Sequence, residues 1–324
     1  MKCALAPLAG FTDAPFRRLC AQLGADLTYT EMVSAAGLAH GSSPTRHLME
    51  LLPGEGPVAC QLFGSNPEEL AFAAHEADAT GRFVEINLNA GCPVPRIVHE
   101  GAGAALVKKP ELVHELLKAM VRETKLPVTL KTRPGPRPDR VLLWELLDAA
   151  ETAGARGITL HARFTSQNHG GDVHLDLLAE LVRRAKIPVG GNGGVVDATT
   201  ARAMAETGVD MVMIGRGAVA RPWIFRELNG LPPLDLGTVP NIVGTDPMKV
   251  LFSRHLDSIL EFRDFLAQKY PRDHVPGVDG FVSVKLHTHL FRYFAGRPGA
   301  GELRRRLNAI RTLAEVRALL ADFP

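Results

Sequence analysis

Short apolar stretches alternate with longer segments of helical pattern through the first two thirds of the chain. Each apolar stretch has four to six residues and precedes a turn of glycine, proline or polar residues, as buried parallel strands require. Polar caps open several of the intervening segments, as with Asp13 before Pro15, and Asn66 before Pro67. The pattern predicts eight strands, at Cys3–Pro7, Leu27–Thr30, Val58–Phe63, Phe83–Leu88, Val128–Thr132, Gly157–His161, Ile187–Gly191 and Asp210–Gly215.

Eight repeated strand–helix units indicate an α/β protein with a (β/α)8 TIM barrel, which we place at residues 1–235. A doubly wound sheet is the alternative, but no GxGxxG follows the first strand. Residues 229–247 are rich in proline and glycine and are typical of a linker. Apolar residues at helical spacing, such as Leu256, Ile259 and Leu260, then predict a small all-helical domain over residues 241–324.

Composition is ordinary for a globular enzyme, with 46% hydrophobic and 22% charged residues among 324. The four cysteines have no metal-type spacing, and no apolar run is long enough for a membrane span or a signal peptide. We therefore expect a reduced, cytoplasmic protein with no metal and no membrane partner, and we expect a monomer. From residue 241 onward, 13 Lys and Arg face 9 Asp and Glu, which suggests a polyanionic partner.

Polar residues follow the predicted strands, at the end of a barrel where active sites lie. Asn89 and Cys92 follow the fourth strand, and Lys131 and Arg133 end the fifth. Lys131 suits a Schiff base, a phosphate contact or negative charge on a cofactor ring, and the sequence does not choose among these. The remaining strand-end residues are Glu31, Gln61, His161 and Arg163.

Glycine-rich turns follow the seventh and eighth strands, at Gly190–Gly194 and Gly215–Gly217. Loops at these two places form the usual phosphate site of such barrels, because glycine lets backbone N–H groups approach phosphate oxygens. Arg216 can add a bidentate contact. The two turns together favour a phosphate-bearing ligand, although either alone would suit a tight turn.

Cys92 lies in a loop between Gly91 and Pro93, whereas the other three cysteines fall inside predicted strands or helices. A loop cysteine held in this way is a candidate acid or nucleophile. The long segment 94–110 that follows it is expected to be a lid over a substrate.

Eight motifs occur in order along the chain, at Ala6–Arg17, Thr30–Met32, Gln61–Gly64, Ile86–Pro93, Lys131–Arg133, His161–Arg163, Gly191–Gly194 and Gly215–Arg216. Together these motifs resemble the tRNA-dihydrouridine synthases, nearest to the bacterial branch that reduces a D-loop uridine. The resemblance implies an FMN-dependent oxidoreductase that uses NADPH or NADH and binds tRNA with its helical domain. The FMN-binding residues it implies are Pro7, Leu8, Ala9, Gln61, Lys131, His161, Asn192, Gly193, Gly194, Gly215 and Arg216.

The same resemblance implies that Cys92 is the catalytic proton donor to the uracil ring, with Asn89 and Arg163 contacting the substrate. Lys285, His289 and Arg292 recur at one helical face and are expected to contact tRNA. The chain departs from the family where Met is common, at Leu8 and Ala90, where Gly is common, at Ala162, and where Asp is frequent, at Gly194.

Other functions remain open at this point. A flavin barrel acting on a free pyrimidine or other small molecule would leave the basic helical domain without a role. A Schiff-base aldolase would act through Lys131 and bind no flavin. A non-catalytic tRNA-binding protein would have no need of so many polar groups at the barrel mouth.

Overall fold

The computed structural model describes residues 1–231, 247–293 and 300–322, and within the later helices some side chains lie outside the description. Parallel strands form a closed barrel, in which β2 pairs with β4 and closes the ring through Thr28 opposite Val58. A short strand, β3, pairs only with the end of β4. The strands are β1 Lys2–Leu5, β2 Leu27–Tyr29, β3 Val33–Ser34, β4 Val58–Phe63, β5 Glu85–Ala90, β6 Val128–Thr132, β7 Ile158–His161, β8 Val189–Asn192 and β9 Met211–Ile214.

The eight predicted strands are confirmed as β1, β2 and β4 to β9, and the TIM barrel with them. Two details differ. The fourth predicted strand lies two residues later, so that Asn89 is inside β5 and not beyond it. The sequence also gave no sign of β3, because a two-residue strand is too short to show an alternating pattern.

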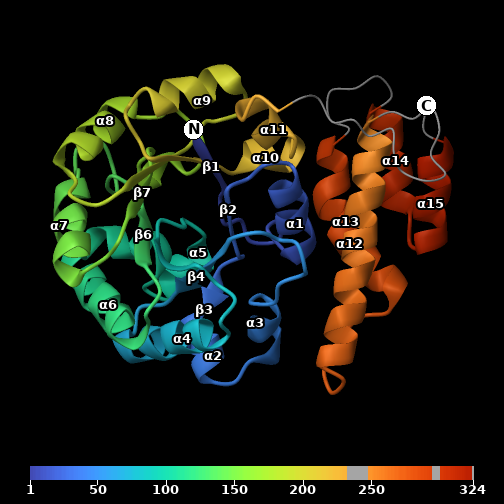
Figure 1. Ribbon diagram of the computed structural model, residues 1–324, viewed down its shortest axis with the longest axis horizontal. Coiled ribbons are helices and arrows are strands. Elements are labelled where there is room, and N and C mark those ends of the chain that lie inside the picture. Colours follow the sequence, from blue (N-terminus) through green and yellow to red (C-terminus); the bar gives the residue numbers. More distant parts are fainter. Residues whose placement is uncertain (232–246, 294–299, 323–324) are drawn as a thin grey trace.

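Helices surround the barrel, as Figure 1 shows. The predicted caps Asp13 and Asn66 are in place, since each side chain accepts a hydrogen bond from the first turn of a helix. Asp197 caps α9 in the same way. The barrel helices are α1 Ala14–Gln22, α2 Ala35–Ala39, α3 Ser43–His47, α4 Pro67–Ala79, α5 Pro95–His99, η1 Gly103–Lys108, α6 Pro110–Glu123, α7 Leu143–Ala153, η2 Thr165–Gln167, α8 Leu175–Arg184, α9 Ala198–Ala205, α10 Arg216–Ala220 and α11 Ile224–Leu228.

Four further helices stand beside the barrel, next to α1 and α10 (Figure 1). They are α12 Pro247–Lys269, α13 Val278–Tyr293, α14 Ala300–Ala309 and α15 Leu313–Asp322. Apolar side chains of α12, among them Phe252, Leu256 and Ile259, belong to the same buried cluster as Phe16 and Leu19 of α1. The hydrophobic core therefore continues from the barrel into these helices.

The predicted linker falls mostly on residues 232–246, which lie outside the described residues together with the boundary between the two predicted domains. The helical character predicted for residues 241–324 is found in each described part of that range. None of the described helices is both long enough and apolar enough to cross a membrane.

Candidate active site

Amide side chains form a hydrogen-bonded chain inside the barrel, at the carboxyl ends of β4 and β5. The Nε2 of Gln61 donates to Oδ1 of Asn87 over 2.7 Å, and Nδ2 of Asn89 donates to Oε1 of Gln61 over 2.9 Å. Asn87 in turn donates to Oγ1 of Thr129 on β6. Gln61 is fully buried, and the hydrogen bonds to Asn87 and Asn89 fix the orientation of its side-chain amide. A contact with a cofactor would be made in addition to these two bonds.

Asn89 also holds the loop that carries Cys92. Its Oδ1 accepts hydrogen bonds of 3.0 Å from the backbone N–H groups of both Gly91 and Cys92. The Cys92 carbonyl accepts a 2.8 Å bond from Ala104 at the start of η1. Gly103 has φ +58°, and a Cβ on it would stand 2.7 Å from that carbonyl, so only glycine allows this approach.

The Cys92 thiol is half-buried, and that burial raises its pKa above the ordinary thiol value. Lys131 and Arg133 act in the opposite direction, with a smaller effect. The thiol therefore carries its proton at neutral pH. This is the state that a proton donor needs and that a cysteine nucleophile avoids.

Arg133 has contacts that its sequence position, as a polar residue at the end of a strand, does not predict. The whole residue is 1% exposed. Its Nε donates 2.7 Å to the Gly91 carbonyl, and its Nη1 donates to the carbonyls of Arg163 and Phe164. Arg133 thus ties the Cys92 loop to the loop that follows β7.

Lys131 points into the same end of the barrel, where its Nζ donates 2.9 Å to Oδ1 of Asn192 at the end of β8. Burial, and then the charge of Arg133, lower the pKa of Lys131 to about 7. Burial also lowers the pKa of His161 far below its ordinary value, with Lys131 and Arg133 adding to the effect. His161 is therefore neutral, and any anion bound here would favour the charged form of Lys131.

The glycine turn after β8 forms a cradle beneath Arg163. Gly193 and Gly194 have φ +118° and +73°, and a Cβ on Gly193 would meet the His161 ring at 2.9 Å. The Nη1 of Arg163 is buried above this turn without a hydrogen-bond partner in the described structure. An unpaired buried guanidinium nitrogen over a glycine turn fits an anionic group such as the phosphate of FMN.

The second glycine turn completes this rim of the barrel. Gly215 caps α10, whose first residue, Arg216, is exposed and donates to the His169 carbonyl over 2.9 Å. The loop of Pro7, Leu8 and Ala9 reaches the same rim, since a Cβ on Gly215 would lie 3.8 Å from the Leu8 side chain. The structure therefore brings the residues expected to bind FMN to one end of the barrel.

The face of α13 that was predicted to bind tRNA is only partly exposed, and its contact with tRNA stays a prediction. Lys285 forms a salt bridge of 2.8 Å with Asp13, and His289 is fully buried between Phe11 and Phe16. Arg292 is exposed, with its guanidinium 4.9 Å from the centre of the Phe11 ring. The helix packs this polar face against α1, which spacing along one helix does not reveal.

Comparisons with known proteins give a consistent result. The family model described as "Dihydrouridine synthase (Dus)" matches residues 4–323. The chain is 38% identical to tRNA-dihydrouridine synthase B of Klebsiella pneumoniae, over 74% of this chain and 76% of that protein. It is 34% identical to tRNA-dihydrouridine synthase B of Proteus vulgaris, over 98% of this chain and 94% of that protein.

Among solved structures, a FabK mutant from Thermotoga maritima is similar at 16% identity, covering 68% of this chain and 62% of that one. Its TM-score is 0.41, which is too low to support an argument. The barrel assignment rests on the strand order and register of this chain.

Proposed function

This chain belongs to the dihydrouridine synthase family of flavin-dependent oxidoreductases, and from that membership we propose that it reduces the C5=C6 bond of a D-loop uridine in tRNA. The curated relatives named above are tRNA-dihydrouridine synthases, which supports tRNA as the substrate. The observation that carries the proposal is the protonated, half-buried Cys92 thiol beside the cation-rich end of the barrel.

FMN is the proposed cofactor, because the residues that would hold it fit its charge. The glycine turns with Arg163 and Arg216 would take the phosphate, and Lys131 would face negative charge on the ring system. When bound and reduced by NADPH or NADH, FMN supplies the hydride for C6 of the uracil. Glycine is required at position 194, because a Cβ there would lie 2.7 Å from the Val173 side chain. The Asp that is frequent in the family would therefore clash in this chain.

Cys92 is the proposed donor of the proton that C5 of the uracil receives. Asn89 fixes the backbone of Cys92 through two N–H bonds, and Arg133 fixes the neighbouring Gly91 carbonyl. These bonds fix the position of the Cys92 backbone, and the raised pKa keeps the thiol protonated. A positioned acid of this kind contributes about 10²–10⁴-fold to the rate.

A uridine in folded tRNA must leave its stack to reach the end of a barrel. The basic C-terminal region supplies charge for the phosphate backbone, with Arg292 of α13 as one exposed contact. We assign tRNA binding to residues 241–324 on this basis, and the FMN-binding barrel to residues 1–235.

The test begins with the absorption spectrum of the purified protein. NADPH is added without oxygen, followed by unmodified tRNA or by free uridine. We expect a yellow protein that NADPH bleaches and that tRNA reoxidises, with free uridine inactive. Mass spectrometry of the digested tRNA then locates the dihydrouridine. A yellow protein reoxidised equally by free uridine would contradict the proposal and favour a small-molecule reductase.

One observation favours a second chemistry, since a lysine with a pKa of about 7 is also suited to Schiff-base formation. An aldolase of this type would be colourless and would be trapped on Lys131 by borohydride in the presence of a carbonyl substrate. Family membership and the glycine cradle argue for the flavin enzyme.

A further inference from the structure

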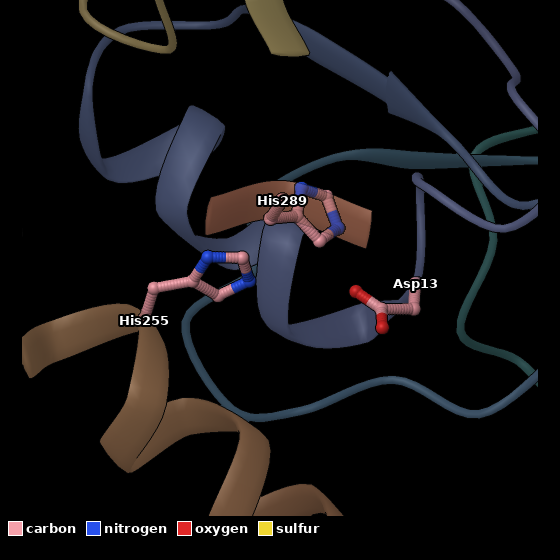
Figure 2. A group of neighbouring side chains, drawn as sticks. All are labelled: Asp13, His255 and His289. Atoms are coloured by element: carbon pink, nitrogen blue, oxygen red, sulfur yellow. The ribbon is translucent and has the colours of Figure 1, made fainter. Parts of the chain in front are cut away.

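Asp13, His255 and His289 meet in the buried contact between the barrel and the C-terminal helices (Figure 2). Asp13 is the N-cap of α1, His255 lies in α12 and His289 lies in α13. Each is at most 5% exposed, and one potential ligand atom of each lies within 4.8 Å of the other two. The two imidazole rings are edge to face, with centroids 4.7 Å apart.

Two imidazoles and a carboxylate are a common ligand set for zinc and related divalent ions. With metal–ligand bonds of about 2.1 Å, tetrahedral geometry places ligand atoms about 3.4 Å apart. The three donors lie within 4.8 Å of one another, so small rotations of the side chains are enough to bring them to this spacing. Burial favours the neutral form of both imidazoles, which is the form that binds a divalent ion.

We propose that Asp13, His255 and His289 bind one divalent transition-metal ion of the zinc class. The ion would cross-link α1 of the barrel to α12 and α13, so that it holds the C-terminal helices in place. The sequence predicted no metal, because these donors are distant along the chain and follow no ligand spacing.

Lys285 is the natural competitor for this ion. Its ammonium lies 2.8 Å from Oδ2 of Asp13, while Oδ1 of Asp13 accepts the N–H of Phe16. Lys285 also interacts with the carboxylate of Glu31, which therefore offers the ammonium a second position. A bound dication would displace the ammonium from Asp13 toward Glu31, because two cations cannot share one carboxylate cheaply.

A cavity next to the cluster offers a way in and room for a water ligand. It has a volume of about 170 Å³ and is lined by Asp13, Glu31, Lys285 and His47, among others. Three protein ligands leave a tetrahedral ion one open position, which a water in this cavity would fill.

The test is a calorimetric titration, in which zinc chloride is added to the metal-stripped, flavin-loaded full-length protein and the heat of binding is measured. We expect one ion per chain in the wild type, and affinity about 100-fold lower in His255→Asn and in His289→Asn. His47→Asn is the matched control, since His47 lines the same cavity but binds Asp273. Wild-type protein that takes up no zinc, or zinc binding that survives in the double His255→Asn/His289→Asn variant, would overturn the proposal.

Two further measurements guard against a variant that does not fold. Cobalt chloride added to the wild type should give the absorption of a nitrogen- and oxygen-ligated ion, whereas a thiolate charge-transfer band would place the metal on a cysteine and refute the site. Lys285→Met should tighten zinc binding about tenfold or more, because the competing charge is gone. Unchanged or weaker binding in Lys285→Met would also count against the site. Neither result depends on the reductase activity.

Discussion

Cationic side chains lack carboxylate partners at the barrel mouth, whereas they have such partners at the contact with the C-terminal helices. At the mouth, Lys131, Arg133 and Arg163 form no salt bridge with any described residue. At the helical contact, each of several cations faces a carboxylate, as in Arg18–Glu261, Lys269–Glu50 and Lys285–Asp13.

This difference separates a binding surface from a docking surface. Cations buried without carboxylates are costly, and an anionic ligand relieves that cost. Cations that already have partners gain little from a ligand and instead fix two parts of the chain together. Variants at the mouth should therefore change chemistry and cofactor affinity, and variants at the docking surface should change stability.

Cys92→Ala has the largest expected effect. Loss of the positioned acid should lower the rate of tRNA reoxidation about 10²–10⁴-fold, while FMN content and reduction by NADPH stay normal. Stopped-flow absorbance separates the two half-reactions. Cys60→Ala is a suitable control, since Cys60 lies in β4 and its side chain belongs to the buried hydrophobic core. Full turnover in Cys92→Ala would remove the acid assignment.

Lys131→Met should weaken FMN binding about 10–100-fold, the usual contribution of a charged hydrogen bond. The pH dependence follows from the lowered pKa. Lys131 of the cofactor-free protein loses its proton near pH 7, and bound anionic FMN should raise its pKa, so FMN affinity falls as pH rises through 7. Fluorescence titrations of the cofactor-free protein at several pH values measure this, and the slope should vanish in Lys131→Met.

Glu50→Gln tests the docking surface. The Glu50 carboxylate is buried and binds Lys269, Tyr270 and Arg82, which together lower its pKa. Because its folded pKa is lowered, its stabilisation is present above the ordinary carboxylate pKa and is lost as pH falls below it. We expect a loss of about 1 kcal/mol in urea unfolding at pH 7, discounted because Lys269 is partly exposed. A matching loss of FMN affinity would break the contrast between the two surfaces.

Arg292→Ala has the smallest expected effect. One phosphate contact fewer should weaken tRNA binding a few-fold and reduce the slope of log affinity against log salt by about one. Filter binding at several salt concentrations gives both numbers. Arg311→Ala, also exposed but on the segment before α15, is the control for general charge loss. A wild-type affinity that does not respond to salt would contradict binding through phosphates.

Much of the barrel could be predicted because each strand repeats one local pattern. Cys92 and the glycine turns were visible in the same way, since loop chemistry follows directly after each strand. His289 shows where this stops. Helical spacing places it on a face with Lys285 and Arg292, but the partner of that face is α1, hundreds of residues earlier, and only tertiary packing decides it. The same holds for Arg133, whose carbonyl partners come from two other loops.

The apolar core shared by α1 and α12 has a consequence for protein engineering. Phe16 and Leu19 on one side, with Phe252, Leu256 and Ile259 on the other, lose their cover together if the chain is cut after residue 231. Such a fragment would expose a contiguous apolar surface to water and should self-associate. A helical region transplanted from a relative would need residues that match the contour of α1, so the two parts are not interchangeable modules.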